Sequence, residues 1–370
     1  MPAPPLQPIV IWFGRVGDMI LLSALLEILH RRYGGACHVI GAGPWPAQIY
    51  AAHRDVARIT CLHRYTAFLF DTAWWRAVRT LRRSRDAPVY VCEYAPRKLA
   101  RISRLLKCGG VSAERCLFIT GTACLEAAPH WVDRLVCFGR LTPAAFASAD
   151  YPSVEALSPP PRYAPRLEVA AAARDECAQW IEAQGWSGRP LILVQPGNRR
   201  TMRGRKLRLT AADDKAWPIE RWAALLQRLH ARAPQAVIVL CGAPRETLLL
   251  AWIVAAARLP AVVAAELPLP RLLALCARAH SMISVDTGPA HAAAALSLPL
   301  VVMFGAHSQA QWLPRSPEGS PVIGVGGPPH SSRLDQISVE TVFAAWCALP
   351  VRQAPGASAL TPTAARATAP

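Results

Sequence analysis

The segment from Ser284 to His291, Ser-Val-Asp-Thr-Gly-Pro-Ala-His, has the residue types of a phosphate site at the start of a helix. The apolar run at residues 282–285 predicts a strand that carries Asp286 at its carboxyl end. Thr287 suits a helix N-cap and Pro289 the first helical turn. Because the first backbone N–H groups of a helix have no intrahelical partner, they are available to phosphate oxygens.

Two further residues of this segment fit such a site. Gly288 lets a ligand approach the backbone closely, and His291 lies one helical turn beyond Thr287 on the same face. The alternative is purely structural: Asp286 and Thr287 would only cap the helix, and His291 would pack in the core. The segment alone favours a binding role by a small margin.

Two other loops carry residues that could do chemistry. Lys215 precedes a Trp217-Pro218 turn and could present a point charge to a diphosphate, although a solvated loop lysine gives the same pattern. The loop from Gly14 to Asp18, Gly-Arg-Val-Gly-Asp, follows the first apolar run of the chain. Its glycines allow a ligand near the backbone, and Asp18 at a helix start is a candidate cap or general base.

Alternating strands and helices are predicted to position these loops. Short apolar runs typical of buried parallel strands alternate with helical patterns in both halves of the chain. This alternation predicts two doubly wound, Rossmann-like α/β domains whose strands end at a shared central cleft, where ligands of such sheets bind. The predicted strands are 9–13, 38–43, 89–92, 191–194, 237–240, 282–285 and 300–304, and the predicted helices are 19–32, 169–183, 222–232, 246–257, 269–279 and 290–296.

The length of 370 residues also favours two domains. Residues 141–166 contain six prolines and little periodic pattern, as is typical of a linker. We therefore expect an N-terminal domain over 1–165, with the linker from about 141, and a C-terminal domain over 166–350. Residues 351–370, rich in Ala, Pro and Thr, are predicted to form a disordered tail.

Composition limits the compartment and the kinds of partner. Forty-one Lys and Arg against 24 Asp and Glu give a formal charge of +17, which favours an anionic partner: nucleic acid, an acidic membrane face or a phosphorylated substrate. The 11 cysteines are scattered and never spaced C-x-x-C, which argues against a disulfide framework or a zinc site and for the reducing cytoplasm. No secretory signal or apolar stretch long enough to span a bilayer is apparent, so we expect a soluble or surface-attached protein.

Taken together and in their order along the chain, the three motifs resemble those of glycosyltransferase family 9, the ADP-heptose:lipopolysaccharide heptosyltransferases. The resemblance covers residues 9–314. The Asp-Thr-Gly-x-x-His motif with a downstream Pro and Phe-Gly is highly specific for that family. The matching text comprises Gly17-Asp18, Lys215-x-Trp217-Pro218, Cys241-Gly-Ala-Pro-Arg-Glu246, Val285-Asp-Thr-Gly-Pro-Ala-His291, Leu298-Pro-Leu-Val-Val-Met-Phe-Gly305 and Trp312-Leu-Pro314.

The resemblance implies a GT-B fold and an inverting sugar transfer that needs no metal or other cofactor, and the absence of an Asp-x-Asp arrangement agrees with this. Asp18 matches the proposed general base, and Lys215 matches the lysine that offsets charge on the leaving diphosphate. The expected donor contacts are Glu246 to the ribose, Leu267 near the nucleobase, and Asp286, Thr287, Gly288 and His291 around the phosphates and sugar.

The acceptor implied by the resemblance is an anionic, lipid-linked glycan at the inner membrane face, bound by the first domain. Arg15, Arg97 and Arg101 are its candidate contacts. Residues 76–107 hold ten basic side chains against two acidic ones, a balance suited to an anionic membrane surface. Trp74 and Trp75 are candidates for the membrane interface, with core packing expected for at least one of them. The protein would then be cytoplasmic and peripheral to that membrane.

Some features depart from the family or leave alternatives open. The family often has Pro at the position of Ala24 and His or a small residue at that of Leu21. A basic insert fits two interpretations equally, a contact to phosphates of acceptor or donor and a solvated loop. It contains Arg199, Arg200, Arg203, Arg205, Lys206 and Arg208. The alternative functions are a GT-B enzyme with another sugar nucleotide, a silent relative that only binds one, and a nucleic-acid-binding protein, for which no recognised module is present.

Overall fold

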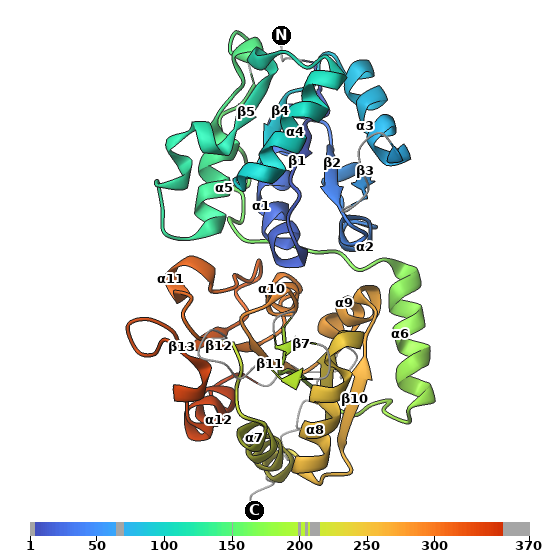
Figure 1. Cartoon of the computed structure of the whole chain (residues 1–370), viewed down its shortest axis with the longest axis vertical. Helices are drawn as coiled ribbons and strands as arrows, with labels where there is room; N and C mark the ends of the chain where they lie inside the picture. The colour runs from blue at the N-terminus through green and yellow to red at the C-terminus, as the bar shows by residue number, and fades with distance from the viewer. Residues whose placement is uncertain are drawn as a thin grey trace, which may run out of the picture.

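The computed structural model describes residues 4–63, 70–149, 151–198, 201–203, 206–207 and 215–350. Two parallel sheets with helices around them lie one above the other in Figure 1. The predicted tail, 351–370, lies outside the described residues, as do Arg199, Arg200, Arg205 and Arg208 of the basic insert.

The first sheet has five parallel strands in the order β3-β2-β1-β4-β5. Its central strand pairs on both sides, Ile9 with His38 of β2 and with Val89 of β4, so its three residues are all buried. The strands are β1 (Ile9–Ile11), β2 (Cys37–Ala42), β3 (Val56–Leu62), β4 (Val89–Val91) and β5 (Cys116–Phe118), and the helices are α1 (Val16–Tyr33), α2 (Trp45–Ile49), α3 (Thr72–Arg83), α4 (Pro96–Gly109) and α5 (Trp131–Arg140).

Helix α3 shows how local sequence sets these elements. Asp71 caps it, accepting hydrogen bonds from the backbone N–H groups of Ala73 (3.0 Å) and Trp74 (3.3 Å). Apart from Trp75, its apolar residues recur at helical spacing and are buried, whereas Arg76 and Arg79 are exposed. Trp74 is fully buried and Trp75 is 43% exposed, which confirms the expected core role for one of the pair.

The second sheet has six parallel strands in the order β10-β9-β6-β11-β12-β13. Its strands are β6 (Leu191–Gln195), β9 (Val237–Gly242), β10 (Val262–Glu266), β11 (Ser281–Val285), β12 (Leu300–Phe304) and β13 (Val322–Gly326). Its helices are α6 (Ala171–Ala183), α7 (Ile219–Arg232), α8 (Thr247–Ala257), α9 (Leu269–Arg278), α10 (Gly288–Ala295), α11 (Gln309–Trp312) and α12 (Val339–Cys347). A small hairpin of β7 (Met202–Arg203) and β8 (Lys206–Leu207) lies within the basic insert.

Every strand and helix predicted by residue range is present, with ends shifted by a few residues. The prediction missed the outer strands β3, β5, β10 and β13. Their residues are only partly buried, so their sequences lack the continuous apolar runs of the central strands. All eleven cysteines are free thiols, as expected, and most are buried.

The two domains meet through helices and the segment that joins them. A single apolar cluster includes residues of α1 and α5 together with Leu273, Ala292 and Ala295 of the second domain. Asp133 of α5 and Arg315 form a two-pronged ion pair across the junction, at 2.6 and 2.7 Å. None of the helices in the described part of the chain is both long and apolar enough to cross a bilayer.

Candidate active site

The starts of α1 and α10, one from each domain, touch at the junction. A Cβ added to Gly288 would lie 2.9 Å from Cγ1 of Val16 and 3.1 Å from the backbone nitrogen of Gly17, too close for any side chain. Strand β1 delivers the loop that ends in Asp18, and β11 delivers Asp286 and Gly288. The fold therefore brings together two motifs that are about 270 residues apart in the chain, because the loops after β1 of one sheet and β11 of the other meet.

On the second domain, Lys215 and Asp286 form a largely buried ion pair. The Lys215 Nζ donates to Asp286 Oδ2 at 2.6 Å and to the Asp286 backbone carbonyl at 3.0 Å. The two side chains are only 14% and 8% exposed. Nδ1 of His307 lies 3.8 Å from the same carboxylate oxygen. The lysine that the sequence marked as a diphosphate contact is thus fixed beside the start of α10.

Thr287 is the N-cap of α10, but its hydroxyl makes no capping hydrogen bond. It donates instead to the Val285 carbonyl at 3.2 Å, so the expected side-chain cap is absent and the first N–H groups of the helix are left without a capping side chain. His291 is buried, and its Nδ1 has no hydrogen-bond partner among the described residues. Burial lowers the pKa of His291 to about 4, so the ring is neutral near pH 7.

Glu246 and Leu267 follow neighbouring strands, β9 and β10. The Glu246 carboxylate is buried, accepts from the Ala243 backbone nitrogen at 2.8 Å through Oε2, and has no hydrogen-bond partner for Oε1 among the described residues. Burial raises the pKa of Glu246. The Leu267 backbone nitrogen bonds the Gly242 carbonyl at 3.3 Å, which holds this apolar side chain near the end of β9.

On the first domain, Asp18 sits in the first turn of α1. Its Oδ2 accepts from the Arg15 backbone nitrogen at 2.7 Å. Burial raises the pKa of Asp18, and Glu93 raises it further, while Lys98 and Arg15 lower it. A Cβ on Gly14 would lie 2.5 Å from Cβ of Asp18, so only glycine allows this turn.

Sequence reasoning missed Glu93 and Lys98, which surround Asp18 electrostatically. Glu93 follows β4 and is fully buried; its Oε1 accepts from the backbone nitrogens of Tyr94 (3.2 Å) and Ala95 (3.1 Å). The Lys98 Nζ lies 3.3 Å from Oε2 of Glu93. One signal for Glu93 was present in the sequence, since this carboxylate comes directly after the predicted strand 89–92. His307, three residues after β12, is likewise a polar side chain close to the end of a strand.

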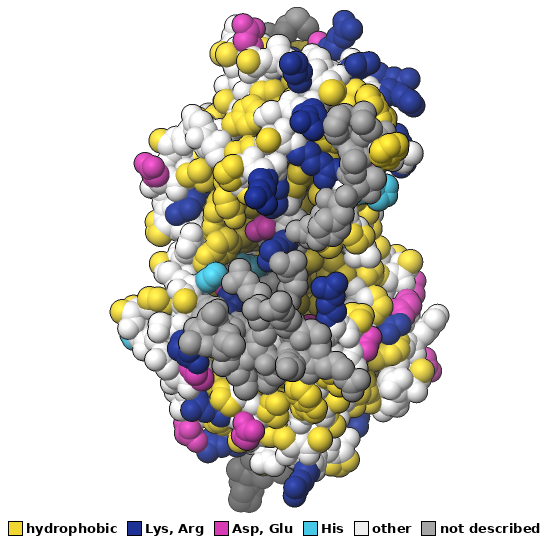
Figure 2. Space-filling view, in the orientation of Figure 1, with side chains coloured by type: hydrophobic (Ala, Val, Ile, Leu, Met, Phe, Trp, Pro, Cys, Tyr) yellow, Lys and Arg dark blue, Asp and Glu magenta, His cyan; other side chains and the backbone are white. Residues whose placement is uncertain are grey.

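The candidate acceptor arginines have different surroundings. Arg15 is exposed at the N-cap of α1, and Arg97 is exposed in the first turn of α4. Arg101 is bound within the domain: its Nη2 donates to the His63 carbonyl at 2.9 Å and lies 3.4 Å from Oδ2 of Asp71. Lys and Arg side chains gather over α3 and α4 in the upper part of Figure 2.

The arrangement combines a carboxylate in a position to take a proton with a cation and a helix start that suit a diphosphate. Residues 145–330, half of the chain, match the family model described as glycosyltransferase family 9 (heptosyltransferase). The lipopolysaccharide heptosyltransferase 3 of Escherichia coli is 30% identical over 132 residues, which are 35% of this chain and 35% of that protein. The match thus spans about a third of that relative's length.

Solved structures extend the similarity of fold to nearly the whole chain. The E. coli ADP-heptose lps heptosyltransferase II is 20% identical with a TM-score of 0.69, covering 93% of this chain and 98% of that one. The glycosyltransferase family 9 protein from Veillonella parvula DSM 2008 is 16% identical with a TM-score of 0.69, over 93% and 97%. The E. coli heptosyltransferase WaaC, solved with ADP, is 18% identical with a TM-score of 0.60, over 92% and 98%. The fold is the GT-B arrangement of two α/β domains, and this chain belongs to glycosyltransferase family 9.

Proposed function

We propose that the protein transfers a heptose from ADP-heptose to a lipopolysaccharide-core or related lipid-linked acceptor, with inversion at the anomeric carbon. The observation that carries the proposal is the contact between the Asp18 loop and the start of α10, beside the buried Lys215–Asp286 pair. One domain thereby offers a base and the other a site for the leaving group, across a single junction.

In the proposed reaction, an acceptor hydroxyl oxygen attacks the anomeric carbon as the bond from that carbon to the diphosphate oxygen breaks. Asp18 takes the hydroxyl proton, and ADP leaves with the bonding electrons. Charge develops on the diphosphate, where Lys215 and the uncapped start of α10 are placed to stabilise it. We propose that this stabilisation makes a divalent cation unnecessary.

The environment of Asp18 suits a general base. A carboxylate in water has a pKa near 4 and is a weak base, whereas burial raises the pKa of Asp18 toward the working range. Asp18 must be ionised to act, so transfer should fall as the pH drops through that raised pKa.

We propose that Glu246 and Leu267 receive the nucleoside. Oε1 of Glu246 is buried without a hydrogen-bond partner among the described residues, so a ribose hydroxyl that donates to it would remove a desolvation cost. Leu267 offers apolar contact to a base but does not distinguish adenine from uracil. The donor could therefore be another sugar nucleotide.

We propose that the acceptor is anionic and lipid-linked and that the first domain meets it at the inner face of the membrane, which makes the protein cytoplasmic and peripheral. Arg76, Arg79 and Arg83 form an exposed stripe along α3, beside Trp75 (43% exposed). Exposed arginines with an aromatic side chain suit an anionic bilayer surface. Arg15 and Arg97 are the exposed acceptor candidates, and we propose no nucleic-acid partner.

Calorimetric titration with ADP, UDP and GDP, without added metal, tests the donor. We expect saturable ADP binding that disappears when Thr287 and Lys215 are both replaced by alanine. A preference for UDP or GDP would transfer the proposal to another sugar nucleotide. If none of the three binds, alone or with an acceptor fragment present, the protein does not use a nucleotide donor at this site.

A further inference from the structure

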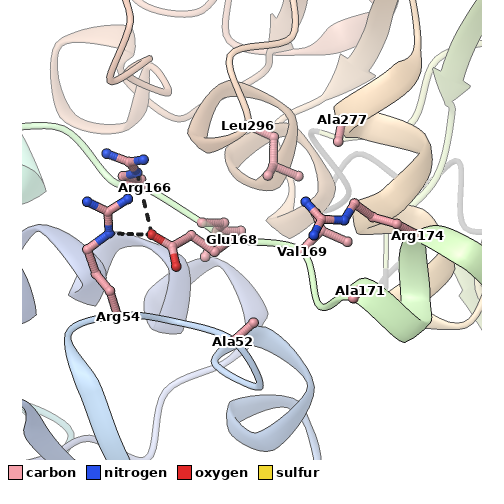
Figure 3. Close-up of a pocket in the computed structure, with 10 residues that line it drawn as sticks. Ala52, Arg54, Arg166, Glu168, Val169, Ala171, Arg174, Ala277 and Leu296 are labelled. Carbon is pink, nitrogen blue, oxygen red and sulfur yellow. Dashed lines mark hydrogen bonds and ion pairs between the residues drawn. The ribbon is translucent and has the colours of Figure 1, made fainter.

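A cavity of about 460 Å³ lies beside the segment that joins the two domains (Figure 3). It is bounded by the turn before β3, the joining segment, the start of α6 and the carboxyl ends of α9 and α10. This volume is within the range of sites that hold small molecules. The lining residues are Ala52, Arg54, Arg166, Leu167, Glu168, Val169, Ala171, Arg174, Ala277 and Leu296.

This cavity is separate from the candidate active site. Leu296 lies at the carboxyl end of α10, whereas Thr287 and Gly288 lie at its start. At about 1.5 Å per residue, eight helical residues separate the two ends by roughly 12 Å. None of the lining residues is among those assigned to donor, acceptor or base.

The wall formed by the joining segment is held by both domains. The Arg166 backbone nitrogen donates to Ser23 Oγ of α1 at 3.0 Å, and the Arg166 carbonyl lies 3.0 Å from Nε2 of His53. The Leu167 backbone nitrogen donates to the Ala295 carbonyl of α10 at 3.2 Å. The joining segment at residues 166–169, which we call the hinge, is thus anchored on each side, and the cavity beside it is a formed feature of the fold.

Positive charge exceeds negative charge in the lining. Arg54 and Arg166 share one carboxylate, with Nε to Glu168 Oε1 distances of 2.5 and 3.9 Å (Figure 3). The Arg174 side chain extends from α6 toward the joining segment, and its guanidinium has no ion-pair or hydrogen-bond partner among the described residues. Three guanidinium groups thus face one carboxylate, which leaves two positive charges without a counter-charge in the lining.

The start of α6 adds to this excess. The helix has 13 residues, its N-cap is Ala170, which has no side chain able to cap it, and its first turn contains no acidic residue. The positive end of its dipole therefore has no capping side chain and no acidic residue of the first turn beside it, at the edge of the cavity that Ala171 and Arg174 line.

We propose that this hinge cavity binds a small polyanion, a molecule with at least two phosphate or carboxylate groups, between Arg54 of the first domain and Arg174 with the start of α6 in the second. Such a ligand would bridge the two domains at the segment that joins them.

Thermal unfolding at constant ionic strength tests the site, with inorganic pyrophosphate and citrate as probes and potassium chloride as the reference salt. For the native chain we expect a saturable rise in Tm with at least one probe; which of the two acts separates phosphate from carboxylate recognition. Arg54→Gln with Arg174→Gln should weaken the apparent affinity by about tenfold or more, as expected for the loss of charged hydrogen bonds.

Two control variants show whether the probes bind at this cavity. Arg232→Gln with Arg258→Gln removes the same charge from exposed positions of the second domain outside the lining and should keep the shift. Lys215→Ala disables the proposed diphosphate site and should also keep it. If the double hinge variant is too unstable, Arg174→Gln alone, at an exposed residue, gives the same test by calorimetry. The proposal is overturned if neither probe exceeds the chloride reference, if the hinge variants keep full affinity, or if Lys215→Ala abolishes the shift.

Discussion

The charged residues of the two domains differ in how far they are buried and paired. In the second domain, Lys215 is held 2.6 Å from Asp286, and both side chains are mostly buried. In the first domain, Asp18 has one backbone hydrogen bond from Arg15, and the arginines along α3 project into solvent.

The difference follows from what each side is proposed to bind. A nucleoside diphosphate is small and the same in every turnover, so a fixed cation and a fixed helix start recognise it without reorganisation. A lipid-linked glycan is large and must enter from a membrane surface, which favours an open, positively charged face. Preorganisation of the binding residues is therefore expected to be greater in the second domain, and the following changes test that division.

The largest effect is expected from Asp18→Asn. The amide keeps the shape of the side chain but takes no proton, so transfer should fall by about a thousandfold, within the range for loss of a general base. ADP affinity should be unchanged, because the diphosphate contacts lie on the other domain. Initial rates with ADP-heptose and a core acceptor, together with ADP calorimetry, measure both. A loss of ADP binding would mean that Asp18 contacts the donor, and the proposed division between a donor domain and an acceptor domain would then be wrong.

A second test uses two buried histidines, one in each domain. Burial lowers the pKa of His38 and of His291 to about 4. Each stays neutral when folded but takes up a proton below about pH 6.5 when unfolded, so stability is lost as the pH falls from about 6.5 toward 4. Between pH 7 and pH 5 each should cost about 2 kcal/mol of the free energy of unfolding.

Replacing either histidine by glutamine should flatten that acid dependence, as measured by urea unfolding at the two pH values. The variants should differ in ADP binding: only His291→Gln should weaken it, because His38 lies in β2 and bonds Thr60 (2.9 Å). An acid dependence that neither change alters would show that burial does not hold these rings neutral.

Lys215→Ala should have the next largest effect. Removing the cation leaves the Asp286 carboxylate buried without its partner and removes a charged contact to the diphosphate. We expect ADP affinity to fall by about 30-fold, the equivalent of one charged hydrogen bond. Lys98→Ala is the matched change in the first domain, where the Nζ pairs with Glu93 at 3.3 Å. It should leave ADP affinity unchanged but raise the pKa of Asp18; equal losses from both lysines would contradict the comparison.

The same contrast explains how far sequence reasoning reached. The donor side could be predicted because its residues occupy short motifs directly after apolar strands, as Asp286 and Thr287 follow β11. The partner of Lys215 could not be predicted, because the Lys215–Asp286 bond joins residues 71 positions apart and depends on strand order. Glu93 beside Asp18 escaped notice for the same reason, since β4 neighbours β1 only in the folded sheet.

The spacing of residues in the sequence also does not show which side chains are bound within the domain. Arg101 shares the helical spacing of Arg97 and Arg104 on α4 but is bound to Asp71 and the His63 carbonyl. Spacing places these residues on a helix, but it does not show which of them meets the start of α3. The assignment of Arg101 to the acceptor thus remains a prediction that now competes with a structural role.

The smallest effect is expected at the contact that joins the two halves. Arg315 lowers the pKa of Asp133, so their attraction stabilises the fold above the unfolded pKa of the carboxyl and is lost as the pH falls through the lowered folded value. Both side chains are about a third exposed, at 33% and 38%, and solvent screens the pair. Asp133→Asn should therefore cost only about 0.5 kcal/mol in urea unfolding at pH 7, and less as the pH falls through the lowered pKa of the carboxyl. A cost of several kcal/mol would mean that the junction itself is a rigid, preorganised unit, and the contrast between a fixed donor side and an open acceptor side would then fail.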